Sequence, residues 1–291
     1  MYKRQPYTAP GLKSTQALPE FYQGATADYV KVDGKWVDGM AQDNMLTALQ
    51  NLQDAYTAGL IDQEAITNTT SSCRDEWYAG TVGCFPYWGG LWGETLTVRL
   101  KQNVPDAEVI ALPPIEGATY LYSAPSVQVI SSKLSDEQVA SVYKYFIEYM
   151  HDGGEGQVLF QSGVEGVHWQ QSGNNIDPLP TISKPAEAFR KAWITPWLAL
   201  TPMTATDKNV EVSQEVTDSL AVVSANAKNI SVFPVSEQRT MITSDLTTTR
   251  ENIISRVAMG QLTPEEGMAE YKAQAETLNV AQALEEMNAN A

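Results

Sequence analysis

The sequence contains few residues of the kinds that build metal centres and disulfide scaffolds. Among its 291 residues are only two cysteines, Cys73 and Cys84, and two histidines, His151 and His168. Four such residues are too few for a Cys-based zinc site or a disulfide-rich fold. The two cysteines are compatible with one disulfide, if the protein lies outside the cytoplasm, or with two free thiols.

Long apolar runs and positive charge are also scarce. No stretch of about 18 consecutive apolar residues is present, so the sequence predicts no membrane-spanning helix. The first five residues carry charge but no apolar run follows them, so we expect no signal peptide at this position, and either the protein is cytosolic or its beginning is missing. With 19 basic and 35 acidic residues, the net charge is −16, and this argues against nucleic acid and anionic membranes as partners.

What the chain does contain predicts a globular α/β protein. Apolar residues make up 43% of it, enough for a sizeable core, and the length suits one large or two ordinary domains. Alternation around Asp33-Gly34 predicts a hairpin over 30–37. Strands are expected at 82–85, 109–112 and 126–130. Helical periodicity and capping signals predict helices at 42–59, 72–79, 135–150, 156–161, 185–195, 209–227, 236–259, 263–275 and 278–288.

The strongest local signal is a segment of glycines and aromatic residues at 87–93, expected to be a loop. Glycine lets the backbone turn sharply, and Tyr87, Trp88 and Trp92 can then form a flat platform for a sugar or another ring with an apolar face. The alternative interpretation is that one or both tryptophans fill the core of the domain.

Signals for catalysis are weaker. The chain has no Gly-x-Ser-x-Gly, His-Glu-x-x-His or phosphate-binding loop. Glu94 and Glu165 lie next to aromatic residues, as a glycosidase pair would, although both also fit a solvated or hydrogen-bonding role. His168, in a glycine-rich turn, fits a structural hydrogen bond or a ligand contact better than a general base.

Five motifs in a fixed order resemble the extracellular solute-binding proteins, family 1, of ABC importers, in their LipO-like lipoprotein branch. Each motif is weak alone, but together they extend from about residue 20 towards the C-terminus. They are Val-Asp-Gly-Lys-Trp-Val at 32–37, Leu-Gln-Asp-Ala-Tyr-Thr-Ala-Gly-Leu-Ile-Asp at 52–62, Trp-Tyr-Ala-Gly-Thr-Val-Gly at 77–83, Leu-Pro-Pro-Ile-Glu-Gly at 112–117 and Gly-Val-Glu-Gly-Val-His-Trp at 163–169.

The resemblance implies a type II periplasmic-binding-protein-like fold, in which two α/β lobes enclose the solute and closure presents it to the permease. It implies that Trp88 contacts the sugar, with Trp92 as the next candidate. Tyr120 and Tyr122 precede a strand that crosses towards the other lobe in the family. Glu165, His168 and Trp169 belong to a recurring motif that serves either the ligand or the hinge.

Family members are nearly twice as long and begin with a signal peptide and a lipobox cysteine. We therefore expect an incomplete fold: an irregular, non-native segment at 1–20, a lobe-two segment at 21–117, a returning lobe-one and hinge segment at 118–177, and a helix-rich C-terminal part at 178–291 packed on lobe two. Such a fragment is expected to bind its solute weakly, because one wall of the cleft is absent.

The leading hypothesis is a monomeric binding protein without catalysis or cofactor, partnered by a small solute and the transmembrane subunits of an ABC permease. In full-length form it would be an extracytoplasmic lipoprotein on the surface of a Gram-positive bacterium. The alternatives are a glycosidase using Glu94 and Glu165, and a cytosolic helical scaffold whose acidic surface meets a basic partner.

Overall fold

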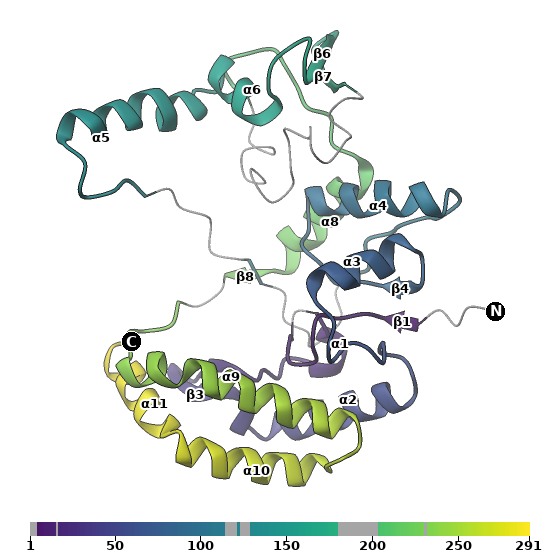
Figure 1. Ribbon diagram of the computed structural model, residues 1–291, viewed down its shortest axis with the longest axis vertical. Helices are drawn as coiled ribbons and strands as arrows, with labels where there is room; N and C mark the ends of the chain where they lie inside the picture. Colours follow the sequence, from purple (N-terminus) through teal and green to yellow (C-terminus); the bar gives the residue numbers. More distant parts are fainter. Residues whose placement is uncertain (1–4, 16, 114–120, 123–128, 180–202, 230–231) are drawn as a thin grey trace. The chain divides into compact units, whose positions relative to one another are not determined.

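A computed structural model of the chain describes residues 5–15, 17–113, 121–122, 129–179, 203–229 and 232–291 (Figure 1). The chain divides into two units. The first comprises Met1–Gly89, Leu96–Ala124 and Asp218–Ala291, and the second comprises Gly90–Thr95 and Pro125–Thr217. Within the described residues, helices predominate and the strands pair into two-stranded sheets. The expected helix-rich α/β character is therefore present, with smaller sheets than the sequence predicted.

The N-terminal segment, expected to be irregular, contains a strand and a short helix. Strand β1 (Gln5–Tyr7) pairs in parallel with β4 (Val82–Cys84), and Tyr7 also bridges Ile61. Helix α1 (Pro19–Tyr22) follows. Local sequence does not reveal strand β1, because its hydrogen-bonding partner β4 lies more than seventy residues later in the sequence.

The predicted hairpin is confirmed. Strands β2 (Tyr29–Val32) and β3 (Lys35–Asp38) pair antiparallel, and Asp33 and Gly34 both have positive φ, 49° and 81°, as a two-residue hairpin turn requires. The helical turn η1 (Gly39–Ala41) follows the second strand directly.

The predicted helix at 42–59 is also confirmed as α2 (Asn44–Thr57). Its apolar residues recur at three- and four-residue intervals and are buried, at Met45, Ala48, Leu49, Leu52 and Ala55. The chain leaves the helix through Gly59, whose φ of 70° is readily available only to glycine.

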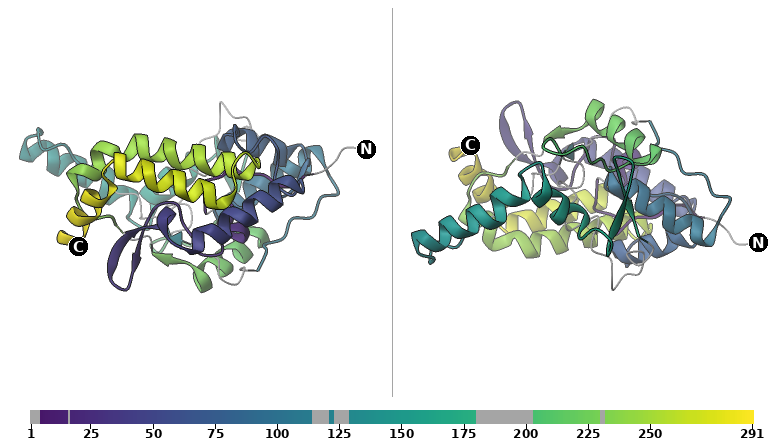
Figure 2. Two further views of the ribbon diagram at one scale, coloured as in Figure 1. Left: turned by 90° about the horizontal axis from the view of Figure 1, so that it is seen from below. Right: turned by 90° about the horizontal axis from the view of Figure 1, so that it is seen from above.

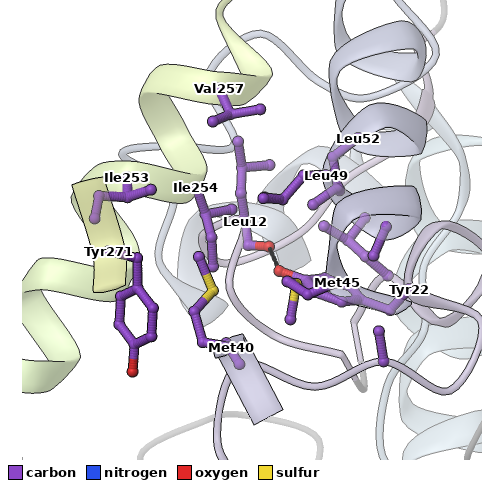
Figure 3. Packing of buried hydrophobic residues seen from close by; sticks show 14 of the residues in the cluster. Leu12, Tyr22, Met40, Met45, Leu49, Leu52, Ile253, Ile254, Val257 and Tyr271 are labelled. Carbon is purple, nitrogen blue, oxygen red and sulfur yellow. Dashed lines mark hydrogen bonds between the residues drawn. The ribbon is translucent and has the colours of Figure 1, made fainter. Parts of the chain in front are cut away.

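Three C-terminal helices complete this core. They are α9 (Glu237–Ala258), begun by the cap Ser236, α10 (Pro264–Thr277), begun by a capping box of Thr263 and Glu266, and α11 (Val280–Ala289). Figures 1 and 2 show α9 and α10 side by side, and α9 also contacts α2 and α11. Buried residues from 7–65 and from 242–287 form one hydrophobic cluster, part of which is drawn in Figure 3.

A buried polar network lies within this cluster. Arg250 of α9 is 3% exposed and donates to Asp38 Oδ1 at 2.7 Å. Tyr271 of α10 donates to Asp38 Oδ2 at 2.6 Å and accepts from Arg250 Nε at 3.1 Å. The network joins the end of the hairpin to two C-terminal helices, and its charges and hydrogen bonds satisfy one another.

The rest of the first unit contains helix α3 (Thr70–Tyr78), most of α4 (Leu91–Asn103), and the C-terminal half of α8 (Gln214–Asn226). Strand β5 (Leu121–Tyr122) pairs in parallel with β8 (Lys228–Asn229). Helices α3 and α8 correspond to predicted helices.

One predicted strand is not found, and another lies mostly outside the described residues. The segment 109–112 is irregular, Ile110 and Leu112 are exposed, and no strand of the described residues pairs with it. Of the strand predicted at 126–130, only residues 129 and 130 are described, and neither is in a strand. The helix predicted at 185–195 lies outside the described residues.

The second unit contains helix α5 (Asp136–Val142), the continuous π-helical segment η2 (Tyr143–Glu148) and helix α6 (Glu155–Ser162). The predicted capping box of Ser135 and Gln138 begins α5. Strands β6 (Trp169–Ser172) and β7 (Asn175–Pro178) form a hairpin that the sequence analysis did not predict. Val158, Trp169, Ile176 and Met203 form a small buried cluster in this unit.

In the part of the chain that the structure describes, no helix combines the length and the apolar character needed to cross a membrane.

Candidate functional site

A cluster of aromatic side chains lies where α3 is followed by β4, in the first unit. The rings of Trp77 and Phe85 have centroids 6.1 Å apart, and those of Phe85 and Tyr87 stack at 4.8 Å with an interplanar angle of 26°. Phe85 and Tyr87 are two residues apart in an extended segment, so they lie on the same side of the chain. We call Trp77, Phe85, Tyr87 and the adjoining Trp88 the aromatic cluster.

Trp88 is the exposed member of this cluster. Its side chain is 56% exposed, whereas the other three are half-buried. The next residue, Gly89, lies so close to α8 that a β-carbon there would come within 3.0 Å of Ser219 Oγ. The absence of a side chain at Gly89 therefore allows this close approach directly after the exposed ring. The interpretation of Trp88 as a core residue does not fit this exposure.

Trp92 and Glu94 lie in a helix instead of the expected loop. The glycine-rich segment ends at Gly90, whose φ is 71°, and α4 begins at Leu91. Trp92, in the first turn, is only 8% exposed. Its burial agrees with the alternative interpretation of this tryptophan as a core residue. Glu94 is half-buried in the same turn.

Of the two predicted tyrosines, Tyr120 and Tyr122, only Tyr122 lies in the described residues. Tyr120 lies outside the described residues. Tyr122 belongs to β5, where its backbone pairs with Asn229. Their role at a solute site therefore stays a prediction.

The turn at 163–169 is held by its own side chains. His168 Nδ1 accepts a hydrogen bond from Val164 N at 2.9 Å, and Trp169 Nε1 donates to Gly163 O at 2.9 Å. Trp169 is 3% exposed, whereas Glu165 is exposed. His168 thus makes the structural hydrogen bond that the sequence suggested. A ligand role for Glu165, His168 and Trp169 stays a prediction, and these residues belong to the second unit.

Both cysteines carry free thiols, which decides between the two states that the sequence left open. Cys73 is buried in α3, and burial raises the pKa of its thiol. Among the described residues, no group of three or more His, Cys, Asp or Glu side chains is arranged to hold a metal ion.

A polar network lies beside the aromatic cluster, on α3. Glu76 accepts from Thr8 Oγ1 at 2.6 Å and from Asn68 Nδ2 at 3.2 Å, and the same Asn68 amide donates to Asp62 at 2.6 Å. Burial, with Asp62 as a lesser cause, raises the pKa of the Glu76 carboxyl. Through Thr8 and Glu76, this network connects α3, the helix that carries Trp77, to the segment directly after strand β1.

Sequence reasoning missed Trp77 and Phe85 as members of the site. The motif at 77–83 carries a family resemblance but does not by itself indicate a cluster of rings. The alternation of aromatic residues at 85 and 87 was the available signal, but nothing in the local sequence places the two rings against α3.

Comparison with known proteins finds similar solved structures. No protein-family profile matches the chain, and no curated protein matches it. The structure is similar to a crystal structure of the alginate-binding protein AlgQ2 without calcium ion, with a TM-score of 0.63 and 15% sequence identity. The similarity covers 98% of this chain but 63% of that one, so this chain spans less than two thirds of its neighbour's length. The chain therefore shares its fold with part of a solute-binding protein.

Proposed function

We propose that this chain is part of the extracytoplasmic solute-binding component of an ABC importer, and that it binds a sugar or oligosaccharide and delivers it to a permease. Support for the solute-binding role comes from the fold, which AlgQ2 shares over 98% of this chain. The observation that carries the sugar assignment is the exposed Trp88, which directly follows the stacked pair Phe85 and Tyr87 in the sequence. Flat aromatic surfaces of this kind bind the apolar faces of sugar rings.

The importer role rests on the family resemblance of the five motifs. By that resemblance the complete protein is a cell-surface lipoprotein that hands its solute to transmembrane permease subunits. The neighbour is an alginate-binding protein, and this is a reason to include uronate oligosaccharides among the first solutes tested.

The test is a titration of the 291-residue chain with neutral and acidic oligosaccharides, followed by tryptophan fluorescence and by NMR of the labelled indoles. We expect saturable changes at the Trp88 indole, and Trp88→Ala should weaken binding by about 1–3 kcal/mol, a magnitude taken from the stacking of bases on aromatic residues. Tyr145→Ala, which removes another exposed ring at η2, is the matched control and should bind as the wild type does.

Three results would count against the proposal. One is the absence of any saccharide-dependent change at millimolar concentration, and another is unchanged binding by Trp88→Ala. The third is hydrolysis of the saccharide that stops in Glu94→Gln or Glu165→Gln, which would support the glycosidase hypothesis instead.

A further inference from the structure

Strand β2 of the first hairpin has a free edge. In the part of the chain that the structure describes, β2 and β3 form a sheet of two strands, and no third strand pairs with either of them. Lys31 and Val32, at the end of β2, are exposed. Figure 2 shows the hairpin projecting from the helices of the first unit. A free strand edge of this kind offers its backbone N–H and C=O groups to another chain.

The edge of β3 is already occupied by a side chain. Asn288 of α11 accepts a hydrogen bond from Trp36 N at 2.8 Å and donates through Nδ2 to Trp36 O at 2.9 Å. The amide of Asn288 therefore takes the place that a neighbouring strand would have at β3. The edge of this small sheet that stays open is the one formed by β2.

The bonds made by Asn288 also fix the direction of the backbone groups in β2. In an antiparallel sheet, facing residues alternate between pairs that exchange both backbone hydrogen bonds and pairs that exchange none. Trp36 directs its N–H and its C=O to Asn288, so its pair with Lys31 exchanges none. The N–H and C=O of Lys31 therefore point away from β3, towards the free edge.

The side chains at this edge are positive, whereas the chain as a whole has a net charge of −16. Lys31 Nζ lies 5.9 Å from the centroid of the Trp36 ring, and Lys35 faces Val32 across the hairpin. Glu285 of α11 lines the same groove of about 500 Å³ as both lysines, but neither lysine forms an ion pair with any described residue. Lysine at a strand edge opposes pairing with an identical edge and favours an acidic strand.

We propose that the free edge of β2 is a docking site for an extended acidic segment of a partner protein, which adds to the hairpin as a third strand. Its backbone bonds to Lys31, while one acidic side chain lies beside the Lys31 ammonium group and an apolar one beside Val32. Successive side chains of a strand point to opposite faces, so the segment alternates acidic and apolar residues. This inference goes beyond the proposed function and does not depend on the solute.

The test titrates two pentapeptides with blocked ends, Val-Glu-Val-Glu-Val and Val-Lys-Val-Lys-Val, into the nitrogen-15-labelled 291-residue chain at low salt. We expect the acidic peptide to bind at least tenfold more tightly than the basic one and to shift the amide signals of Lys31 and Val32. It should also slow the exchange of the Lys31 amide hydrogen at least tenfold, because that hydrogen enters a bond. Raising the ionic strength should reduce the preference for the acidic peptide, because charge pairing at an exposed edge is screened.

Two variants separate the backbone contribution from that of the charge. Lys31→Pro removes the N–H that points to the free edge but no bond between β2 and β3, so the hairpin should persist while binding of the acidic peptide falls at least tenfold. Lys31→Gln keeps the N–H and should weaken that binding about threefold. Lys101→Gln, at an exposed lysine of α4, is the matched control and should bind within twofold of the wild type. If Lys31→Pro lowers the melting temperature, amide exchange in the wild type and the Lys31→Gln titration decide.

Several outcomes would overturn this inference. They are equal affinity for the two peptides, acidic-peptide binding that a folded Lys31→Pro variant keeps in full, and the absence of any amide shift at millimolar peptide. A concentration-dependent dimer in sedimentation experiments, lost in Lys31→Pro, would show instead that a second copy of the chain takes the edge. The saccharide titration involves neither β2 nor the peptides, so a failure here leaves the proposed function standing.

Discussion

Two regions of the first unit use aromatic residues in opposite ways. In the helical core, Tyr271 is fully buried and its hydroxyl is held between Asp38 and Arg250. In the aromatic cluster, Trp88 is 56% exposed, whereas the other three rings are partly buried. The residue type is similar, but the Tyr271 ring is enclosed in the helical core, whereas Trp88 is followed by glycine and stays exposed. The difference teaches that burial decides which aromatic rings can stabilise the core and which remain available for the proposed binding.

The arginine at the centre of the core should give the largest effect on stability. Arg250→Met leaves the buried carboxylate of Asp38 without its ionic partner, and the free energy of unfolding should fall by about 3–5 kcal/mol. Urea denaturation followed by circular dichroism measures this. Arg256→Met, which breaks a half-exposed ion pair with Glu270, is the control and should cost about 0–1 kcal/mol. A loss below 1 kcal/mol for Arg250→Met would show that the buried network contributes little.

Removing one hydroxyl from the same network should have a smaller effect. Tyr271→Phe deletes the donor to Asp38 and the acceptor of Arg250 Nε, leaving two buried partners short of a bond. We expect a loss of about 1–3 kcal/mol in the same denaturation experiment. Tyr56→Phe removes an exposed bond to Gln63 O and should be close to neutral. Equal losses for both variants would contradict the distinction between buried and exposed hydroxyls.

The polar network beside the aromatic cluster should make stability depend on pH. Burial raises the folded-state pKa of Glu76, with a lesser contribution from Asp62, so the fold favours the protonated carboxyl. This contribution is complete below the unfolded pKa of about 4.3 and is lost as the pH rises through the higher folded pKa.

Glu76→Gln cannot ionise, so its stability relative to the wild type should improve between pH 4 and pH 8. Thermal melts across this range test the sign of the effect. Glu64→Gln, at an exposed glutamate, is the control and should follow the wild type. A variant whose stability relative to the wild type falls with rising pH would contradict the assignment.

The smallest effect on stability is expected at Trp88. Trp88→Ala should leave the free energy of unfolding within about 0.5 kcal/mol of the wild type, because an exposed ring makes few contacts. Trp36→Ala, at a buried ring, should cost about 3–5 kcal/mol and shows what a core tryptophan contributes. If the two variants melt alike, the contrast between the core and the aromatic cluster is wrong.

The sequence by itself determined the elements whose signals are local. The Asp33-Gly34 turn, the capping box of Ser135 and Gln138, and the apolar spacing of α2 were each readable because backbone sterics and neighbouring residues decide them. The glycine-rich segment predicted exposed rings at Trp88 and Trp92 alike, and of these two the structure leaves Trp88 exposed and buries Trp92.

Only the tertiary structure decided which distant segments meet. Arg250 and Asp38 are 212 residues apart, and no local pattern marks either as the partner of the other. The same holds for β1 with β4 and for the packing of Trp77 on Phe85. It also holds for the apolar run at 109–112, which forms no strand. Hydrogen bonds in sheets and the burial of rings depend on what the rest of the chain brings alongside, and that information is distributed over the whole sequence.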